Sequence, residues 1–424
     1  MSVAEYLIGD VFDVLASMPD ASVDLVLTSP PFLALRSYLP ADHPDKHKEI
    51  GSEPTPAEFL DTLLALTAEW GRVLAPHGSI CVELGDTYSG SGGTGGDIIT
   101  VERDGMTTRK RVGATERQQQ SLDPHESEDG KYEGQRLQDR RRVSTTGNRN
   151  RDNAEGWPLD KSLCGIPHLY HLSLAYGRNL LTGEPSPAGQ WRVRNVVAWC
   201  RPNPPVGALG DKFRPATSYM TIACRARDRW FDLDAVRHQN DRCDEQTTAN
   251  DKGGVRGAMQ SPQNPAGAPP LDWWNVSTEP YSGSHYATWP RKLLDRPIKA
   301  MCPMQVCVEC GQPRRRIVGD VNYNLADIQG GPAGDTSDNT GRNGAPGRFG
   351  TYSADTVGWS DCGHDHWRNG IVLDPFAGSG TTLAVATGHG RDAIGIDLDA
   401  RNAELARERI GMFLTVTDTT EVVA

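Results

Sequence analysis

Residues 29–32, Ser-Pro-Pro-Phe, lie where a strand is expected to end. The preceding apolar run, residues 25–27, predicts a buried strand. Two successive prolines must end that strand, because each fixes φ and lacks a backbone donor. The chain therefore leaves the sheet in a stiff, exposed turn that could orient a reacting group. Taken alone, the motif is equally compatible with a turn that only ends the strand.

A glycine loop with the sequence VLDPFAGSGTT is the second stretch with chemical potential. It places Asp374 at a strand's end and glycines at 378 and 380 in a turn, where a ligand can approach the backbone closely. The next strand ends in Asp397, 19 residues after Gly378, in a position to bind ribose hydroxyls. Leu383 replaces the third glycine of the dinucleotide fingerprint. A nucleoside cofactor such as S-adenosylmethionine therefore fits better than NAD.

Length and composition restrict the class of protein. Only 37% of the 424 residues are hydrophobic, and the 45 glycines and 29 prolines are concentrated in three stretches, so much of the chain is expected to be loop. The sequence has no apolar run of about 18 residues and no signal-peptide pattern. Nine cysteines, an odd number, argue against a secreted disulfide framework. We expect a soluble, cytoplasmic protein.

Apolar periodicity predicts an α/β fold whose mostly parallel sheet is assembled from both ends of the chain. Thr55 and Glu58 form a capping box that predicts a helix from Pro56 onward. The other expected elements are strands at 6–8, 24–28, 79–84, 191–204, 371–374 and 393–397, a hairpin of 217–226 with 229–236, and helices at 11–18, 165–181, 285–302 and 400–410. The strands at 24–28 and 371–374 are expected to be neighbours, because the two motifs must meet to act together.

The combination of TSPPF with DPFAGSGTT resembles the amino-group DNA methyltransferases, which modify N4 of cytosine or N6 of adenine. The order, with the catalytic element first and the cofactor loop last, is similar to the β group of that family. The stretches LIGD and SGSHYATWPRKL also resemble family segments near the cofactor. The resemblance implies a circularly permuted, Rossmann-like methyltransferase sheet with large irregular inserts, and S-adenosylmethionine as cofactor.

The resemblance also assigns roles to individual residues. The catalytic residues would be Ser29, Pro30, Pro31 and Phe32. Ser29 and the carbonyl of Pro30 would accept the hydrogens of the target amine, and Phe32 would stack on a flipped base. The cofactor-binding residues would be Asp10, His285, Ala287, Asp374, Phe376, Gly378, Ser379, Gly380, Thr381 and Asp397.

Composition and the resemblance together divide the chain into seven segments. Residues 1–89, 161–237 and 271–301 would form the catalytic half, its continuation and a cofactor-lining helix segment. Residues 371–424 would form the cofactor-binding half. The remaining segments are a flexible insert that is a candidate for target recognition (90–160), a flexible loop (238–270) and a candidate zinc-knuckle insert (302–370).

Cys307 and Cys310 have the spacing of a zinc knuckle, and Cys362 and His364 supply two further ligands across a polar stretch. Four such ligands suit a structural Zn²⁺ site. His366 or Cys302 could replace one of them, and free thiols in a polar insert are the alternative.

Double-stranded DNA is the partner that the resemblance implies, with no membrane partner, and a cognate restriction endonuclease is left open. The net charge of −11 argues against a nucleic-acid partner, but basic residues dominate between 136 and 151. Arg140, Arg141 and Arg142 are therefore candidate DNA contacts, although a charge run is usually a solvated face.

The serine before the two prolines favours N4 of cytosine within this family, with N6 of adenine as the alternative. A non-catalytic DNA-binding protein with a methyltransferase fold is the rival from another class. A dinucleotide-dependent oxidoreductase would leave the Ser-Pro-Pro turn unexplained.

Overall fold

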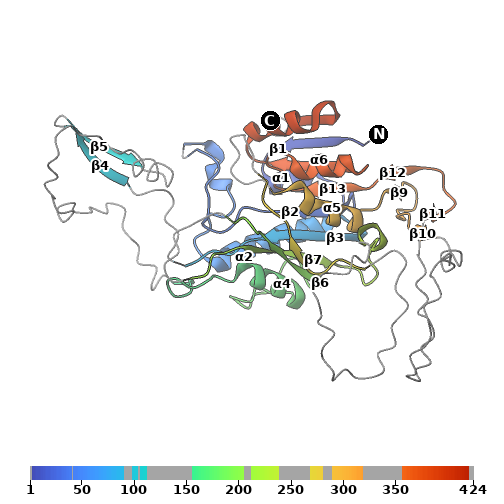
Figure 1. Ribbon diagram of the computed structural model, residues 1–424, viewed down its shortest axis with the longest axis horizontal. Coiled ribbons are helices and arrows are strands. Elements are labelled where there is room, and N and C mark those ends of the chain that lie inside the picture. The colour runs from blue at the N-terminus through green and yellow to red at the C-terminus, as the bar shows by residue number, and fades with distance from the viewer. Residues whose placement is uncertain are drawn as a thin grey trace, which may run out of the picture.

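The computed structural model describes residues 2–40, 42–89, 155–204, 212–237, 268–279, 289–318 and 356–419, and the backbone of two strands at 98–103 and 106–111. In these ranges nine strands form the main sheet: β1 (Ala4–Ile8), β2 (Val23–Thr28), β3 (Leu74–Leu84), β6 (Arg192–Cys200), β7 (Thr217–Cys224), β8 (Trp273–Asn275), β13 (Ile371–Asp374), β14 (Asp392–Asp397) and β15 (Leu414–Asp418). Their order is β15-β1-β14-β13-β2-β3-β7-β6-β8 (Figure 1).

The sheet is parallel from β15 through β3, and β7 pairs antiparallel with both β3 and β6. β8 then pairs parallel with β6. β13 lies directly beside β2, with Val372 opposite Leu25 and Leu373 opposite Val26. This confirms the predicted fold, a mostly parallel, permuted α/β sheet. It also confirms that the strands leading to the two motifs are neighbours.

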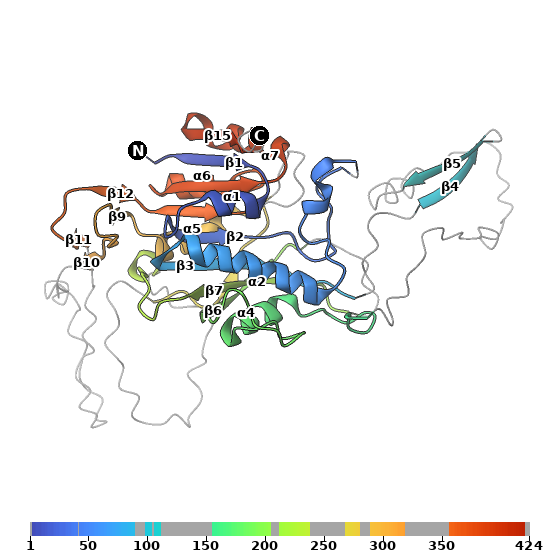
Figure 2. The same cartoon turned by 180° about the vertical axis from the view of Figure 1, so that it is seen from behind.

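Helices cover both faces of the sheet and make three layers. One face buries apolar side chains of α1 (Val11–Ser17), α2 (Pro56–Val73) and α4 (Ile166–Tyr176), which stand in front of the sheet in Figure 2. The opposite face buries those of α5 (Arg291–Met301), α6 (Thr381–Gly388) and α7 (Ala400–Ile410) (Figure 1). Short 3-10 helices occur at η1 (Pro44–Lys48), η4 (Asp234–Val236) and η6 (Gly411–Phe413).

The chain leaves β2 and β13 toward opposite faces of the sheet. The segment after β2 leads to α2 on one face, whereas the segment after β13 leads to α6 on the other. Adjacent parallel strands whose connections diverge create a crevice at their carboxyl ends, and this is where α/β proteins bind ligands. The topology therefore directs the Ser-Pro-Pro turn and the glycine loop to one crevice.

The helix start predicted at Thr55 and Pro56 is confirmed, with Thr55 as the N-terminal cap of α2. The Thr55 hydroxyl accepts a hydrogen bond from the backbone N–H of Glu58 at 3.2 Å, and Pro56 occupies the first helical turn. Phe59, Leu63 and Trp70 are fully buried along one side of the helix. The cap residues therefore set where this helix begins, and its apolar face packs it against the sheet.

Several element boundaries differ from the predictions. The hairpin of 217–226 with 229–236 is wrong: β7 pairs with β3 and β6, and residues 229–236 contain only η4. β3 begins at Leu74, before the predicted 79, and α4 ends at Tyr176 because Gly177 adopts the left-handed conformation. Residues 285–288 of the predicted helix 285–302 lie outside the described residues, and α5 starts after Pro290. β15, which the sequence patterns did not predict, completes the edge beside β1.

Three two-stranded sheets accompany the main sheet in the described ranges: β4 (Ile98–Arg103) with β5 (Met106–Arg111), β9 (Gln305–Cys307) with β12 (Trp367–Asn369), and β10 (Arg316–Val318) with β11 (Thr356–Trp359). β4 and β5 lie in the predicted insert 90–160, where no regular structure was expected. None of the helices in the described ranges has the length and apolar character needed to span a membrane.

Candidate active site

A cavity of about 1470 Å³ opens at the carboxyl ends of β13, β2 and β3. A site for one drug-sized ligand usually measures about 300–1,000 Å³, so this cavity has room for a nucleoside cofactor and a second nucleotide. All four predicted catalytic residues line it: Ser29, Pro30, Pro31 and Phe32. So do six of the predicted cofactor-binding residues: Asp10, Phe376, Gly378, Ser379, Thr381 and Asp397.

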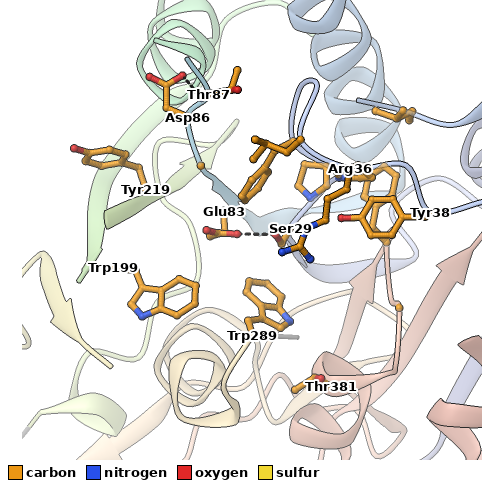
Figure 3. A pocket seen from close by; sticks show the side chains of 18 of the residues that line it. Ser29, Arg36, Tyr38, Glu83, Asp86, Thr87, Trp199, Tyr219, Trp289 and Thr381 are labelled. Carbon is orange, nitrogen blue, oxygen red and sulfur yellow. Dashed lines mark hydrogen bonds between the residues drawn. The ribbon is translucent and has the colours of Figure 1, made fainter. Parts of the chain in front are cut away.

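Ser29 is held by an acid from the neighbouring strand. The register of β2 and β3 places Thr28 opposite Val82, so the next residues, Ser29 and Glu83, also face each other. The Ser29 hydroxyl donates a hydrogen bond to Oε2 of Glu83 at 2.6 Å (Figure 3). Because the hydroxyl hydrogen is engaged by Glu83, the oxygen lone pairs of Ser29 remain available as acceptors.

Glu83 is the main functional residue that the sequence reasoning missed. Only 3% of it is exposed, and its Oε1 has no hydrogen-bond partner among the described residues. Burial raises the pKa of Glu83, although the neighbouring hydroxyls of Ser218 and Ser29 act in the opposite direction. A carboxylate with a raised pKa beside a hydroxyl can take up a proton that passes through that hydroxyl. The sequence did contain a signal for Glu83. It is an acid within the apolar strand 79–84, and buried strands seldom contain a carboxylate.

Aromatic side chains from separate elements line the space around Ser29. The ring of Phe32 lies against Gly85, where an added Cβ would approach Cε2 of Phe32 to 2.6 Å. Trp199 at the end of β6, Tyr219 on β7 and Trp289 before α5 also line the cavity, and Figure 3 shows their rings around the Ser29–Glu83 pair. Flat apolar walls of this kind can enclose a planar base.

The glycine loop is anchored from both sides. The backbone N–H of Gly378 donates to Oδ2 of Asp397 at 2.8 Å, and the Tyr6 hydroxyl donates to the carbonyl of Gly378 at 2.7 Å. Oδ1 of Asp397 accepts from the N–H of Asp399 and the amide of Asn402, at 2.8 and 3.1 Å. Burial raises the pKa of Asp397 to about 6. Oδ2, which accepts only one of these bonds, keeps a lone pair for a ligand hydroxyl.

Asp374 and Gly380 support the loop from outside the cavity. Neither residue lines the cavity. Asp374 accepts hydrogen bonds from the hydroxyls of Thr28 and Thr382, at 2.7 and 2.5 Å, and its side chain is buried. Gly380 begins α6 with φ of 72°, and an added Cβ would approach Ala406 to 2.8 Å. In this structure Asp374 positions the loop and Gly380 allows close helix packing, and the direct cofactor contact of these two residues stays a prediction.

The remaining predicted cofactor residues divide into two groups. Asp10 caps α1 by accepting from the N–H groups of Phe12 and Asp13, at 3.0 and 3.2 Å, and still faces the cavity. His285 and Ala287 lie outside the described residues. Leu398, Asp399 and Asn402 also line the cavity and were not predicted. They follow Asp397 directly in sequence or on the first turn of α7, so their proximity could have been inferred.

The rim near β6 and β7 carries basic and aromatic side chains. Arg201 lies 5.1 Å from the ring centroid of Trp199, and Nζ of Lys212 lies 3.5 Å from that of Tyr88. Phe213 beside them is 98% exposed. Arg201, Lys212 and Phe213 all line the cavity. Arg140, Arg141 and Arg142, the predicted DNA contacts, lie outside the described residues.

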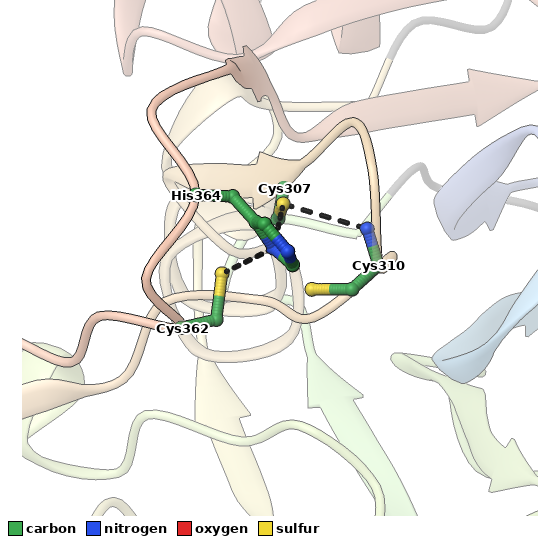
Figure 4. Close-up of side chains that lie close together, drawn as sticks. All are labelled: Cys307, Cys310, Cys362 and His364. Atoms are coloured by element: carbon green, nitrogen blue, oxygen red, sulfur yellow. Dashed lines mark hydrogen bonds between the residues drawn. The ribbon is translucent and has the colours of Figure 1, made fainter.

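The predicted metal ligands lie together, away from this cavity. The donor atoms of Cys307, Cys310, Cys362 and His364 all lie within 4.8 Å of one another (Figure 4). In the part of the chain that the structure describes, neither Cys302 nor His366 belongs to this group.

Comparisons with known proteins agree with the site. A family model described as DNA methylase, of the N6/N4 type, matches residues 364–408, which contain the glycine loop and Asp397. Type II methyltransferase M.Cfr9I of Citrobacter freundii is 24% identical over 286 residues, which cover 68% of each chain. Type II methyltransferase M.SmaI of Serratia marcescens is 22% identical over 410 residues, covering 95% of this chain and 89% of its own.

Among solved structures, the PvuII DNA methyltransferase (cytosine-N4-specific) aligns with a TM-score of 0.42 and 13% identity, covering 96% of this chain and 86% of its own. The family match and the two curated relatives confirm the resemblance noted in the sequence. The chain is thus similar to the N6/N4 amino-group DNA methylases, and these matches support an amino-group methyltransferase.

Proposed function

We propose that the protein transfers a methyl group from S-adenosylmethionine to the exocyclic amine of a base flipped out of double-stranded DNA, most specifically N4 of cytosine. The observation that carries this proposal is the Ser29–Glu83 hydrogen bond of 2.6 Å in the same cavity as the glycine loop. An oriented acceptor for an amine thus shares one cavity with a nucleoside-binding loop.

The residues of the glycine loop fit S-adenosylmethionine. Asp397 has acceptor capacity for ribose hydroxyls, and its carboxylate is held in place by Gly378 and Asn402. Ser379 lines the cavity and is only 2% exposed. Its Oγ has no hydrogen-bond partner within the described residues. A ligand with polar groups at this end of the cavity would satisfy that hydroxyl. S-adenosylmethionine, when bound, supplies an electrophilic methyl group.

The Ser-Pro-Pro turn can make the exocyclic amine of the target base a better nucleophile. The lone pair of an exocyclic amine is delocalised into the ring, so acceptors must engage its hydrogens and draw the nitrogen toward tetrahedral geometry. Ser29 Oγ can accept one hydrogen of the amine while its own hydroxyl hydrogen is donated to Glu83. The carbonyl of Pro30 can accept the other, and the fixed φ of proline limits where it points.

The methylated nitrogen carries a surplus proton, and the same pair can remove it. The proton passes from nitrogen to Ser29 Oγ as the original hydroxyl proton passes to Oε2 of Glu83. The raised pKa of Glu83 favours this transfer. The proton then leaves to solvent when the product departs.

DNA would approach the rim formed by Arg201, Lys212 and Phe213. Two cationic side chains can contact phosphates, and an exposed phenyl ring can insert beside an extruded base. Trp199 and Trp289 would then enclose the base. These features support a nucleic-acid substrate despite the net charge of −11.

The choice of N4 of cytosine rests on Ser29 before the two prolines, and N6 of adenine is the alternative. Unmethylated genomic DNA would be incubated with enzyme and cofactor, digested to nucleosides and analysed by mass spectrometry. We expect N4-methylcytosine with the wild-type enzyme and far less of it with Ser29→Ala after the same incubation time. N6-methyladenine would reassign the base, whereas a folded enzyme that modifies no DNA would favour a non-catalytic DNA-binding protein.

A pH profile tests the role of Glu83 separately. Because Glu83 must be ionised to accept the proton, the single-turnover rate should rise as pH rises through its raised pKa. Glu83→Gln should slow transfer and flatten the profile. An unchanged profile in the variant would show that Glu83 only orients Ser29.

A further inference from the structure

The cluster of Cys307, Cys310, Cys362 and His364 is unrelated to the cavity chemistry. Among the described residues that line the cavity, none belongs to this cluster. None of the eight described cysteines forms a disulfide, so no disulfide explains the convergence. Cys307 and Cys310 lie more than 50 residues before Cys362 and His364 in the sequence. Tertiary structure has therefore gathered four soft donors at one point.

The spacing of the donors fits a tetrahedral ion. Nδ1 of His364 lies 3.5 Å from Sγ of Cys307 and 3.5 Å from Sγ of Cys362. With Zn–S about 2.3 Å and Zn–N about 2.0–2.1 Å, a tetrahedral site has S···N edges of about 3.6 Å. Figure 4 shows the four side chains pointing toward one centre from two separate loops.

The two loops share a backbone design. In each, a glycine in the left-handed conformation follows a cysteine: Gly311, with φ of 69°, follows Cys310, and Gly363, with φ of 83°, follows Cys362. The N–H of Cys310 donates to Sγ of Cys307 at 3.5 Å. Such a bond orients a sulfur ligand and stabilises its thiolate.

We infer that Cys307, Cys310, Cys362 and His364 bind one structural Zn²⁺. Three sulfurs and one imidazole are typical of zinc and fill all four positions, which leaves none for a substrate. The ion closes the loop between β9 and β12 and fixes the pairing in which Cys307 lies opposite Trp367.

The ion also acts at a distance on the catalytic strand. Arg368 on β12 donates to both carboxylate oxygens of Asp24, at 2.6 and 3.1 Å, and Asp24 is fully buried in β2. His77 and the N–H of Ile371 complete the environment of this carboxylate. Without the ion β12 would loosen, and the buried charge of Asp24 would lose its cationic partner. The zinc site thus stabilises the end of β2 opposite Ser29.

Metal analysis of protein purified without chelators tests the site directly. We expect about one zinc per chain in the wild type and about none in Cys310→Ser, with Cys310→His retaining the metal because imidazole is also a zinc ligand. Cys200→Ser is the matched control, since Cys200 is half-buried and lies outside the cluster. It should keep its zinc.

Stability provides a second readout. Cys310→Ser should lower the melting temperature by several degrees and increase amide hydrogen exchange in β9, β12 and β2. If the variant proves insoluble, chelator titration of the wild-type protein, followed by zinc readdition, replaces it. Wild-type protein that neither carries zinc nor takes it up, or a Cys310→Ser variant with full zinc content, would overturn the inference. Both results are independent of methyl transfer.

Discussion

The two turns at the carboxyl ends of β2 and β13 reach the same cavity, but they are held in different ways. The glycine loop has several anchors close in sequence: Asp374 accepts from Phe376 and Thr382, at most eight residues away. Tyr6 and Thr28 add two hydrogen bonds from the other end of the chain. The Ser-Pro-Pro turn depends on Glu83, which is 54 residues from Ser29. The cofactor loop therefore has local anchors as well as distant ones, whereas the Ser29–Glu83 pair requires two neighbouring strands in the correct register.

One buried hydrogen bond joins the two turns. Thr28 immediately precedes Ser29, and its hydroxyl donates to Asp374, which opens the glycine loop. Both side chains are buried, and burial raises the pKa of Asp374 to about 6. The bond couples the position of the acceptor to the position of the methyl donor's loop.

Ser29→Ala should separate the two turns most clearly. It removes an acceptor that acts chiefly in the transition state, so single-turnover methyl transfer should fall on the order of a hundredfold. Cofactor affinity, measured by calorimetry, should hold because the glycine loop is intact. Near wild-type transfer by the folded variant would reduce the motif to a strand-ending turn.

Asp397→Asn should have the opposite signature. The ionised carboxylate is the better acceptor for ribose hydroxyls, so wild-type cofactor affinity should rise as pH rises through about 6. The variant should bind S-adenosylmethionine more weakly by roughly 1.5–3 kcal/mol at pH 8.

Calorimetry over a range of pH values measures both effects of Asp397→Asn. The pH dependence should flatten in the variant, apart from any contribution of Asp374. Equal affinities for wild type and variant would show that the ribose lies elsewhere.

Thr28→Val tests the coupling between the turns. The substitution keeps the shape of the side chain and deletes the hydroxyl donor to Asp374, so the free energy of unfolding should fall by about 1–3 kcal/mol. Urea denaturation measures this loss. Thr28→Ser retains the hydroxyl and should preserve cofactor affinity better than Thr28→Val, and the reverse order would contradict the coupling.

Phe213→Ala should have the smallest effect and act on DNA alone. Because the ring is 98% exposed, stability and cofactor affinity should not change. Binding to a methylatable duplex should weaken severalfold, as measured by fluorescence anisotropy, if the ring inserts beside the target base. Met412→Ala is the control, since Met412 is 90% exposed and does not line the cavity. Equal DNA affinity for both variants would place the DNA on another face.

Local sequence patterns predicted the elements with strong end signals. The capping box at Thr55, the prolines that end β2 and the glycine loop after β13 were all visible in the sequence. Patterns without such signals failed. β6 ends at Cys200 and β7 begins at Thr217, and periodicity alone could not select this long connection over the shorter hairpin.

The sequence by itself determined the residue types of the site: a serine and two prolines in one turn, glycines in another, and an acid after the next strand. Tertiary structure decided that these residues meet at one crevice and that Ser29 pairs with Glu83. It also decided that Asp374 is buried beneath the loop, where it accepts from Thr28. Strand register and burial set those relations, because they fix which distant side chains face each other and which are removed from solvent.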